Sequence, residues 1–439
     1  MRVREKIEHS VKELNERLIE RDQLIKLTIL AMFSKAHMFL IGERGVAKSL
    51  TVRLLGKLIG DAKYWELQVG VDTEAKQLFG EKRIADNGTI YYNAVNTVLD
   101  AHIIFLDEMF KAKSSILNML LQMMADRYYT TGDGRMIEVP LIFLIGASNE
   151  YPTGSLAEPY LDRLDFWYDV SRIQTRENRL KFFNTDFNQK PIEEPIFTLD
   201  EINETYREAI KSVSFPDNVL ETLNDIIDNF ILQGVKTSDR KYSNAIKSMK
   251  VSAYINGRES INFSELFLFL FTSWHNDIER RKVVDVIYYR MFSNKAHLEG
   301  LVKDVKDGFE KNDTYYKSDL YNYSNHLLSF TGERAVEAFQ SYLSATHECL
   351  ITYNKLYEEL EKTKNEIERI LNVEQLVKEN IFLSEIENKS ITDDLLESIR
   401  NIETLIVNEW KIINSWIENN NTLHSYNEKK HILNDKTNL

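Results

Sequence analysis

One stretch near the N-terminus decides how the chain folds: Phe39-Leu40-Ile41-Gly42-Glu43-Arg44-Gly45-Val46-Ala47-Lys48-Ser49-Leu50. The apolar residues 38–41 predict a buried strand, and residues 50–59 predict an amphipathic helix. In a glycine-bearing loop between a strand and a helix, backbone N–H groups and the positive end of the helix bind phosphate oxygens. A lysine in that loop reaches the outer phosphates, and a serine hydroxyl binds Mg²⁺. The stretch therefore predicts a phosphate-binding loop, or P-loop.

The loop departs at one position from the usual pattern, which is G-x-x-x-x-G-K-[ST]. Ala47 stands where that pattern has glycine, and Glu43-Arg44 places a charged pair in the loop. Taken alone, the stretch also fits a surface turn between a strand and a helix. The rest of the chain has to decide between the two interpretations.

Composition narrows the class of protein. The 439 residues, 43% hydrophobic and 28% charged, predict a soluble globular chain of roughly two or three domains. The net charge of −13 disfavours a protein that follows a nucleic-acid backbone, although it leaves room for a local basic patch. Cys349 is the only cysteine, so we expect no intrachain disulfide, no cysteine zinc cluster and a reducing compartment. Since no apolar run is long enough for a bilayer and no signal core is visible, we expect a cytoplasmic protein without a membrane span.

The N-terminal part predicts alternating helices and strands. Beyond the P-loop strand, strands are expected at 64–69, 101–107 and 140–147, and helices at 3–18, 21–35 and 114–124. Two hairpins are expected, one with a type I′ turn at Asn87-Gly88 and one around Gly132-Asp133-Gly134. The alternation predicts an α/β class with a doubly wound parallel sheet over residues 1–190.

Polar side chains follow two of these strands. Asp107 and Glu108 end the apolar run 101–107, and Asn149 follows the run 141–147. Because α/β sheets bind ligands at the carboxyl ends of their strands, we expect Asp107 to hold a metal with Ser49, and Glu108 to orient or deprotonate an attacking water. Asn149 is expected to polarise that water or touch the terminal phosphate. The plain alternatives are a solvated strand end for the acidic pair and a turn residue for Asn149.

Two arginines are candidates for action on phosphates. Arg163, in Leu161-Asp162-Arg163-Leu164-Asp165-Phe166, is expected to project from a helix end onto the nucleotide of another subunit. A salt bridge to Asp162 or Asp165 is the structural alternative. Arg240 lies at a predicted helix start capped by Ser238 or Asp239, and its alternative is an exposed first-turn cation.

The remainder of the chain predicts helices. Residues 196–305 predict an all-helical lid, after a linker at 184–199. Residues 330–420 predict a coiled-coil-like hairpin or bundle, because neutral or apolar residues recur there at steps of three and four. The first seam is Val336, Phe339, Leu343, Thr346, Leu350, Tyr353, Tyr357, Leu360, Lys364, Ile367 and Leu371, and the second is Leu395, Ile399, Ile402, Ile406, Trp410, Ile413 and Ile417. An ordinary lid extension and a dedicated partner-binding arm both remain open. The polar tail 421–439 is predicted to be disordered.

Six motifs, in the order in which they stand in the chain, resemble those of one family. They are Leu18-Ile19-Glu20-Arg21, the P-loop Gly42 to Ser49, Phe105-Leu106-Asp107-Glu108-Met109-Phe110-Lys111, Ala147-Ser148-Asn149-Glu150, Leu161-Asp162-Arg163 and Ser238-Asp239-Arg240. Over residues 13–277 the chain resembles the MoxR family of AAA+ ATPases, and it is most similar to the RavA type, whose P-loop also has Ala before the Lys.

The resemblance implies an AAA+ P-loop NTPase core that assembles as a homo-oligomer, a hexameric ring. It implies that ATP and Mg²⁺ are bound by Ser49 and Asp107 with the loop residues, and that Glu108 and Asn149 act in the same subunit. Arg163 would reach the neighbour's γ-phosphate as an arginine finger, and Arg240 would be the sensor-2 arginine, acting on its own or the neighbouring nucleotide. Ile19 would line the adenine pocket. The implied nucleotide-binding loop residues are Gly42, Gly45, Val46, Ala47, Lys48, Ser49 and Leu50.

We therefore expect a Mg²⁺-dependent ATPase, converting ATP and water to ADP and phosphate, that remodels protein clients as a chaperone does. The resemblance implies hairpins that face the ring's pore and a partner with a von Willebrand A domain. The sequence does not identify the client protein. A nucleic-acid-linked AAA+ motor is one alternative, which the acidic charge disfavours. A nucleotide-gated scaffold with little turnover is another, for which Ala47 and Glu43 leave room.

Overall fold

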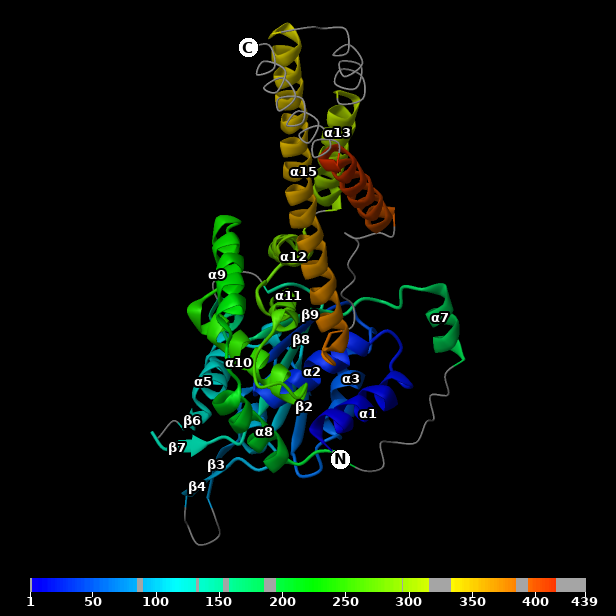
Figure 1. Cartoon of the computed structure of the whole chain (residues 1–439). Helices are drawn as coiled ribbons and strands as arrows, with labels where there is room; N and C mark the ends of the chain where they lie inside the picture. The colour runs from blue at the N-terminus through cyan, green and yellow to red at the C-terminus, as the bar shows by residue number, and fades with distance from the viewer. Residues whose placement is uncertain are drawn as a thin grey trace, which may run out of the picture. The chain divides into compact units, whose positions relative to one another are not determined.

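The computed structural model resolves into two compact units (Figure 1). It describes residues 2–84, 90–131, 134–152, 158–184, 195–293, 295–315, 333–383 and 394–415. Unit 1 comprises Met1–Met291 and Gln375–Ile386, and unit 2 comprises Phe292–Glu374 and Glu387–Leu439. The chain thus leaves unit 1, returns to it for one short segment and leaves it again.

A five-stranded parallel sheet forms the centre of unit 1. The strand order is β2-β5-β8-β1-β9, with β1 at Met38–Ile41, β2 at Tyr64–Gln68, β5 at Ile103–Asp107, β8 at Phe143–Ser148 and β9 at Phe166–Asp169. The middle strands β5, β8 and β1 are buried almost throughout, which explains why their sequences are continuous apolar runs. The predicted α/β class with a parallel sheet is confirmed.

Helices precede, connect and follow the strands, and the connecting ones make the crossovers that parallel pairing requires. They are α1 (Val3–Asn15), α2 (Asp22–Ser34), α3 (Lys48–Gly56), α4 (Ala75–Phe79), α5 (Ser114–Asp126), α6 (Glu158–Leu161) and α7 (Arg176–Phe183), with 3₁₀ turns η1 (Val98–Asp100) and η2 (Met109–Lys111). The helices expected at 3–18, 21–35 and 114–124 are present with slightly different ends. Helix α2 is buried nearly all round, since it packs inside unit 1.

The edge strand β9 was not predicted. Its four residues, Phe166–Asp169, pair with β1 in parallel register, and Met38 lies opposite Phe166. A run this short carries no periodicity that separates a strand from a helix end. It becomes a strand because β1 offers it a pairing edge.

Both predicted hairpins are present in the described residues. Strands β3 (Glu81–Ile84) and β4 (Ile90–Asn93) pair antiparallel, as do β6 (Tyr128–Thr130) and β7 (Met136–Glu138). The rings of Tyr92 and Tyr129 lie 6.1 Å apart, so the two hairpins adjoin each other (Figure 1). The type I′ turn expected at Asn87-Gly88 lies outside the described residues.

The second part of unit 1 is an all-helical lid, as expected. Its elements are α8 (Leu199–Ser212), α9 (Asp217–Leu232), α10 (Asp239–Ile255), η3 (Phe263–Leu268), α11 (Phe269–Thr272) and α12 (Asp277–Phe292). Ser238 caps α10 by accepting a hydrogen bond from the N–H of Lys241. Of the two predicted candidates for this cap, Ser238 and Asp239, the structure therefore has Ser238. Most of the linker predicted at 184–199 lies outside the described residues.

Unit 2 is helical. It contains α13 (Lys295–Tyr315), most of α15 (Glu333–Glu379) and a helix over residues 394–415. Asn312 of α13 donates to the carbonyl oxygen of Cys349, and Lys364 of α15 pairs with Glu403 at 3.0 Å. Both shorter helices therefore lie against α15, and the helical C-terminal extension is confirmed. The predicted tail 421–439 lies outside the described residues.

The first predicted seam is partly wrong in register. Its positions Thr346, Tyr353, Leu360 and Ile367 are buried, but Tyr357 and Leu371 are exposed. The intervening buried residues stand one position earlier in each heptad: Tyr342, Cys349, Leu356, Thr363 and Ile370. Burial of the threonines is possible because the Thr346 and Thr363 hydroxyls donate to carbonyl oxygens four residues earlier in α15. The second seam is buried at Leu395, Ile399, Ile402, Ile406 and Ile413, as predicted.

Membrane insertion has no support in the described helices. None of them combines the length and the apolar composition that a bilayer crossing needs.

Candidate functional site

The carboxyl edge of the sheet gathers the predicted chemistry. In the sheet register, Ile41 of β1 lies opposite Ser148 of β8, and Asp107 of β5 lies opposite Ala147 of β8. The P-loop, the acidic pair and Asn149 therefore leave three adjacent strands at the same edge. The Gly42 N–H donates to the Ser148 carbonyl oxygen at 3.1 Å, which fixes the base of the P-loop beside the strand that leads to Asn149.

Three positions of the P-loop have backbone environments that favour glycine. Gly42 packs so closely against β9 that a Cβ on it would lie 2.5 Å from the Val170 carbonyl oxygen. Gly45 has φ +81°, a left-handed value at which a side chain is strained. Ala47 is also left-handed, with φ 65° and ψ 23°. A left-handed backbone favours glycine, which explains why glycine is usual before the lysine. In this chain alanine adopts that conformation.

Lys48 is the buried cation of the loop. Its ammonium group donates to the carbonyl oxygens of Gly42 at 2.5 Å and Glu43 at 3.0 Å. Burial lowers the pKa of Lys48, while the carboxylates of Asp107 and Glu108 act in the opposite direction. The lysine therefore lies at the same edge as the acidic pair, bonded to groups that a phosphate can replace.

The charged pair Glu43-Arg44 has partners on both sides of the loop. The Glu43 carboxylate accepts a hydrogen bond from Arg172 Nε at 2.6 Å, just beyond β9. Arg44 turns the other way, and its Nε lies 3.9 Å from Glu108 Oε1. Glu43 is thereby neutralised by Arg172, so it does not place an uncompensated negative charge beside the phosphates.

Asp107 and Glu108 occupy different environments at the end of β5. The Asp107 carboxylate accepts from the Glu108 N–H at 3.0 Å and is half-buried. Glu108 is 6% exposed and has a left-handed backbone with φ 56°. A non-glycine residue held in this region costs about 1–3 kcal/mol and is typical of functional sites. Lys111 Nζ, 3.5 Å from Glu108 Oε2, provides a second cation beside that carboxylate.

The remaining predicted site residues lie in the first turn of α3, directly after β8 and before α2. Ser49 is half-buried in the first turn of α3, and Leu50 is 46% exposed beside it. Asn149 is half-buried directly after β8. Ile19 is half-buried in the connection between α1 and α2, two residues before Arg21.

Arg21 is a loop contact that was not assigned a role from the sequence. Its guanidinium group donates to the Val46 carbonyl oxygen at 3.1 Å and 3.3 Å, and to the Ser171 carbonyl oxygen at 2.8 Å. It is 5% exposed. Arg21 thus ties the P-loop to the first turn of α2 and to the segment after β9.

Arg163 and Arg240 meet in a cavity of about 440 Å³, which the P-loop does not line. The cavity lies next to Ala36 and His37, at the amino end of β1, whereas the P-loop leaves the carboxyl end of the same strand. The cavity lining includes more basic than acidic side chains: Lys35, Arg127, Arg163, Arg240 and Lys247 against Asp126 and Asp165. Its chemistry suits an anionic ligand.

The segment around Arg163, residues 161–165, is held by the lid. Lys241 Nζ donates to the Leu161 carbonyl oxygen at 3.1 Å, and Asn244 donates to Asp165 Oδ1 at 2.8 Å. Among the described residues Arg163 makes no ion pair with Asp162 or Asp165, and its Nη1 donates to the Pro159 carbonyl oxygen instead. Arg163 Nε is buried with no hydrogen-bond partner there. The salt-bridge alternative for Arg163 is therefore wrong.

Buried charge accompanies these contacts. Burial lowers the pKa of Lys241 to about 7, although the nearby carboxylates of Asp165, Asp162 and Glu279 act in the opposite direction. Burial and the charge of Arg127 hold the pKa of His37 well below its usual range, so this imidazole is neutral in the folded chain. Its Nδ1 accepts a hydrogen bond from the Leu144 N–H at 3.0 Å.

Comparisons with known proteins agree with this arrangement. Residues 5–189 match the family model described as the MoxR domain in the MoxR-vWA-beta-propeller ternary systems, and residues 218–287 match an AAA lid domain. The uncharacterized protein MJ0812 of Methanocaldococcus jannaschii is 33% identical over 299 residues, which cover 67% of this chain and 77% of that protein. The chain belongs to the MoxR family of AAA+ ATPases.

Other relatives share a smaller part of the chain, and one solved structure shares the fold over a longer part. Chaperone MoxR1 of Mycobacterium tuberculosis is 27% identical over 180 residues, covering 39% of this chain and 46% of that protein. A crystal structure from Cytophaga hutchinsonii, 18% identical, has a TM-score of 0.55 and covers 65% of this chain and 94% of its own. At that identity the structural likeness supports the fold alone. The C-terminal extension falls outside both family models.

Proposed function

We propose that this MoxR-family chain is a Mg²⁺-dependent ATPase of the RavA type that works as a ring and remodels protein clients. The observation that carries the proposal is the meeting of the P-loop, Asp107, Glu108 and Asn149 at one edge of the sheet. Three adjacent parallel strands bring them together, as in sites that bind nucleotides at the carboxyl end of a sheet. A solvated strand end does not account for the burial of Glu108.

The residues at this edge fit ATP and Mg²⁺. The loop offers the Lys48 ammonium group and the N-terminus of α3, both suited to phosphate oxygens. Ser49 and Asp107 offer the oxygen ligands that Mg²⁺ prefers. In the described residues no group of three or more His, Cys, Asp or Glu side chains forms a metal cage, so such an ion would share its ligands with phosphates and water. When bound, Mg²⁺ neutralises charge on the phosphates.

Each side chain then has a distinct task in hydrolysis. Lys48 would leave the carbonyl oxygens of its own loop to hold the outer phosphates. Glu108, buried at the strand end, would orient an attacking water and accept its proton, and Asn149 would hold that water or the terminal phosphate. The backbone strain at Glu108 is consistent with a carboxylate kept in a fixed orientation.

Assembly as a ring is proposed from the location of the two arginines. The four residues of β1 separate the P-loop from the cavity of Arg163 and Arg240 by roughly 13 Å of strand. Arginines at that cavity would serve the nucleotide of a neighbouring subunit rather than their own. We therefore propose that Arg240, like Arg163, acts across the subunit interface, and this favours a closed homo-oligomer, which we expect to be hexameric.

A partner with a von Willebrand A domain is proposed from the matched family, whose description names a ternary system of MoxR, vWA and beta-propeller proteins. The adjoining hairpins β3–β4 and β6–β7 expose Ile84, Tyr91 and Met136, which suits contact with an unfolded client in the pore.

Mixing of two inactive variants tests the site and the ring together. Arg163→Ala and Glu108→Gln should each lose hydrolysis, whereas an equimolar mixture should recover activity at about a quarter of its interfaces by random assembly. Arg240→Ala should recover in the same way. Absence of recovery, with mixed rings demonstrated by mass measurement, would refute action in trans. Proteins that copurify with Glu108→Gln in ATP would identify the client.

A further inference from the structure

The last turn of the long helix α15 and the residues that follow it belong to unit 1. Residues 375–386 belong to unit 1, although the residues on both sides of them belong to unit 2. Within this segment, Asn380 is 2% exposed, Phe382 0% and Leu383 5%. Residues 380–383 are here called the latch, and all of them except the half-buried Ile381 are as buried as the core of the lid.

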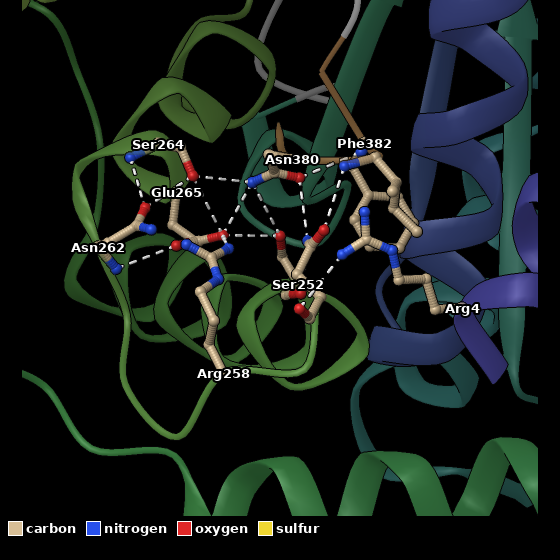
Figure 2. A network of polar contacts seen from close by, with 10 residues as sticks. Arg4, Ser252, Arg258, Asn262, Ser264, Glu265, Asn380 and Phe382 are labelled. Carbon is tan, nitrogen blue, oxygen red and sulfur yellow. Dashed lines mark hydrogen bonds and ion pairs between the residues drawn. The ribbon is translucent and has the colours of Figure 1, made fainter. Parts of the chain in front are cut away.

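Asn380 uses its whole side-chain amide in this docking (Figure 2). Its Nδ2 donates to Glu265 Oε1 at 2.8 Å, to Ser264 Oγ at 3.0 Å and to Ser252 Oγ at 3.3 Å. Its Oδ1 accepts from Asn256 Nδ2 at 3.2 Å and from the Phe382 N–H at 3.1 Å. An asparagine offers two donors and one acceptor oxygen, and all of them are engaged here.

The acceptor at the centre of this network is itself a buried charge. Glu265 is 0% exposed and pairs with Arg258 (Figure 2). Burial raises the pKa of Glu265, and the charge of Arg258 acts in the opposite direction. A carboxylate in such a site needs its donors, so the latch is held by more than apolar contact.

The other end of the latch reaches helix α2. The Phe382 carbonyl oxygen accepts a hydrogen bond from Gln23 Nε2 at 2.8 Å, and Gln23 is fully buried in the first turn of α2. Two residues earlier, Arg21 donates to the Val46 carbonyl oxygen in the P-loop. The same helical turn therefore contacts the latch and the nucleotide loop.

We propose that the latch positions the P-loop through this turn, with Gln23 and Arg21 as positioning residues. When the latch is docked, Gln23 fixes the start of α2, and Arg21 holds Val46 and the loop in the conformation that accepts phosphates. Unit 2 continues the chain on both sides of the latch, so the latch joins unit 2 to this turn through the covalent chain. The proposal rests on nucleotide binding at the P-loop, as proposed above.

Hydrogen exchange of the full chain without nucleotide tests the positioning directly. Gln23→Met and Asn380→Ala should make the amides of residues 42–49 exchange at least about fivefold faster, because the loop opens more often. Exchange in β8, residues 143–148, serves as the reference for general destabilisation. Thr28→Val is the matched control, since its buried hydroxyl bonds within α2 to Leu24, and it should change P-loop exchange less than about twofold. Equal P-loop exchange in the wild type, Gln23→Met and Asn380→Ala would overturn the proposal.

Calorimetric titration with Mg²⁺ and ADP tests whether the two residues act in series. Arg21→Met should weaken binding about tenfold, and Gln23→Met severalfold. The double variant should bind no more weakly than Arg21→Met alone, because both changes interrupt one connection. Fully additive losses in binding free energy would show that Arg21 and Gln23 act on the P-loop independently. If the wild type binds neither ADP nor ATP, the proposed function fails. The exchange experiment, which uses no nucleotide, still tests whether the latch positions the P-loop.

Discussion

The ammonium group of Lys48 donates to the carbonyl oxygen of Gly42 at 2.5 Å, so the lysine of the P-loop is bonded to the first residue of its own loop. A bound phosphate would have to replace this contact, and Lys48→Ala removes the only lysine of the loop. We expect Lys48→Ala to weaken ATP binding at least about 100-fold, as judged by titration with a fluorescent ATP analogue. The folded structure should persist. Lys57→Ala, at an exposed lysine beyond α3, is the control and should bind ATP like the wild type.

Ala47 carries backbone strain that glycine would relieve. Its φ of 65° costs an alanine about 1–2 kcal/mol, and the extra freedom of glycine in the unfolded chain offsets about 0.4–1 kcal/mol of that. Ala47→Gly should therefore raise the free energy of unfolding by up to about 1.6 kcal/mol and keep ATP binding. Ala209→Gly, inside helix α8, should lower it by about 1 kcal/mol. Urea denaturation of both variants checks the opposite signs, and destabilisation by Ala47→Gly would show that the strain is absent.

Glu43 should matter little for nucleotide affinity. It is paired with Arg172, and both side chains are largely exposed, so the pair contributes about 0–1 kcal/mol. Glu43→Gln should bind ATP within about twofold of the wild type. An increase of tenfold or more in affinity would mean that the carboxylate repels the phosphates in spite of Arg172.

Because His37 is buried and neutral, we expect the folded protein to lose stability in mild acid. Its pKa is held below the ordinary value of about 6.5, so below that pH the unfolded chain takes up a proton that the folded chain does not. Stability should then fall by on the order of 1 kcal/mol between pH 7.5 and 5.5. In His37→Asn, whose Oδ1 can still accept from the Leu144 N–H, this component should disappear. Urea denaturation of both proteins at the two pH values measures it, and identical pH dependence would exclude His37 as its source.

The sequence predicted the carboxyl edge of the sheet because the signals there are local. An apolar run such as Ile103–Asp107 has no periodicity to misjudge, and parallel strands necessarily end at one edge. The convergence of Asp107, Asn149 and the P-loop follows from that rule without knowledge of any individual contact.

Long-range contacts could not be predicted in the same way. Strand β9 exists because β1 pairs with it, and Glu43 is compensated by Arg172, far along the chain. Likewise, neither Gln23 nor Asn380 belongs to any recognisable motif, and their shared role emerges only from the path of the chain between the units.

The register of the α15 seam shows a different limit. Spacing placed Tyr357 and Lys364 in the predicted seam. Steps of three and four would fit Leu356 and Thr363 equally well. The structure buries the second set, and the threonine satisfies its hydroxyl within the helix. Which face of a helix is buried depends on the helices that pack against it, and the sequence pattern of a single helix does not specify them.

Glu108 offers the most direct test of the central claim, that the carboxyl edge of this sheet hydrolyses ATP. Glu108→Gln should bind ATP within about threefold of the wild type and hydrolyse it at least about 100-fold more slowly, because the amide cannot accept the proton of the attacking water. Glu150→Gln, at an exposed carboxylate two residues beyond β8, should hydrolyse ATP normally. Phosphate release measured at saturating ATP and Mg²⁺ decides the matter: turnover lost in Glu108→Gln alone supports the account, and equal turnover in Glu108→Gln and wild type would contradict it.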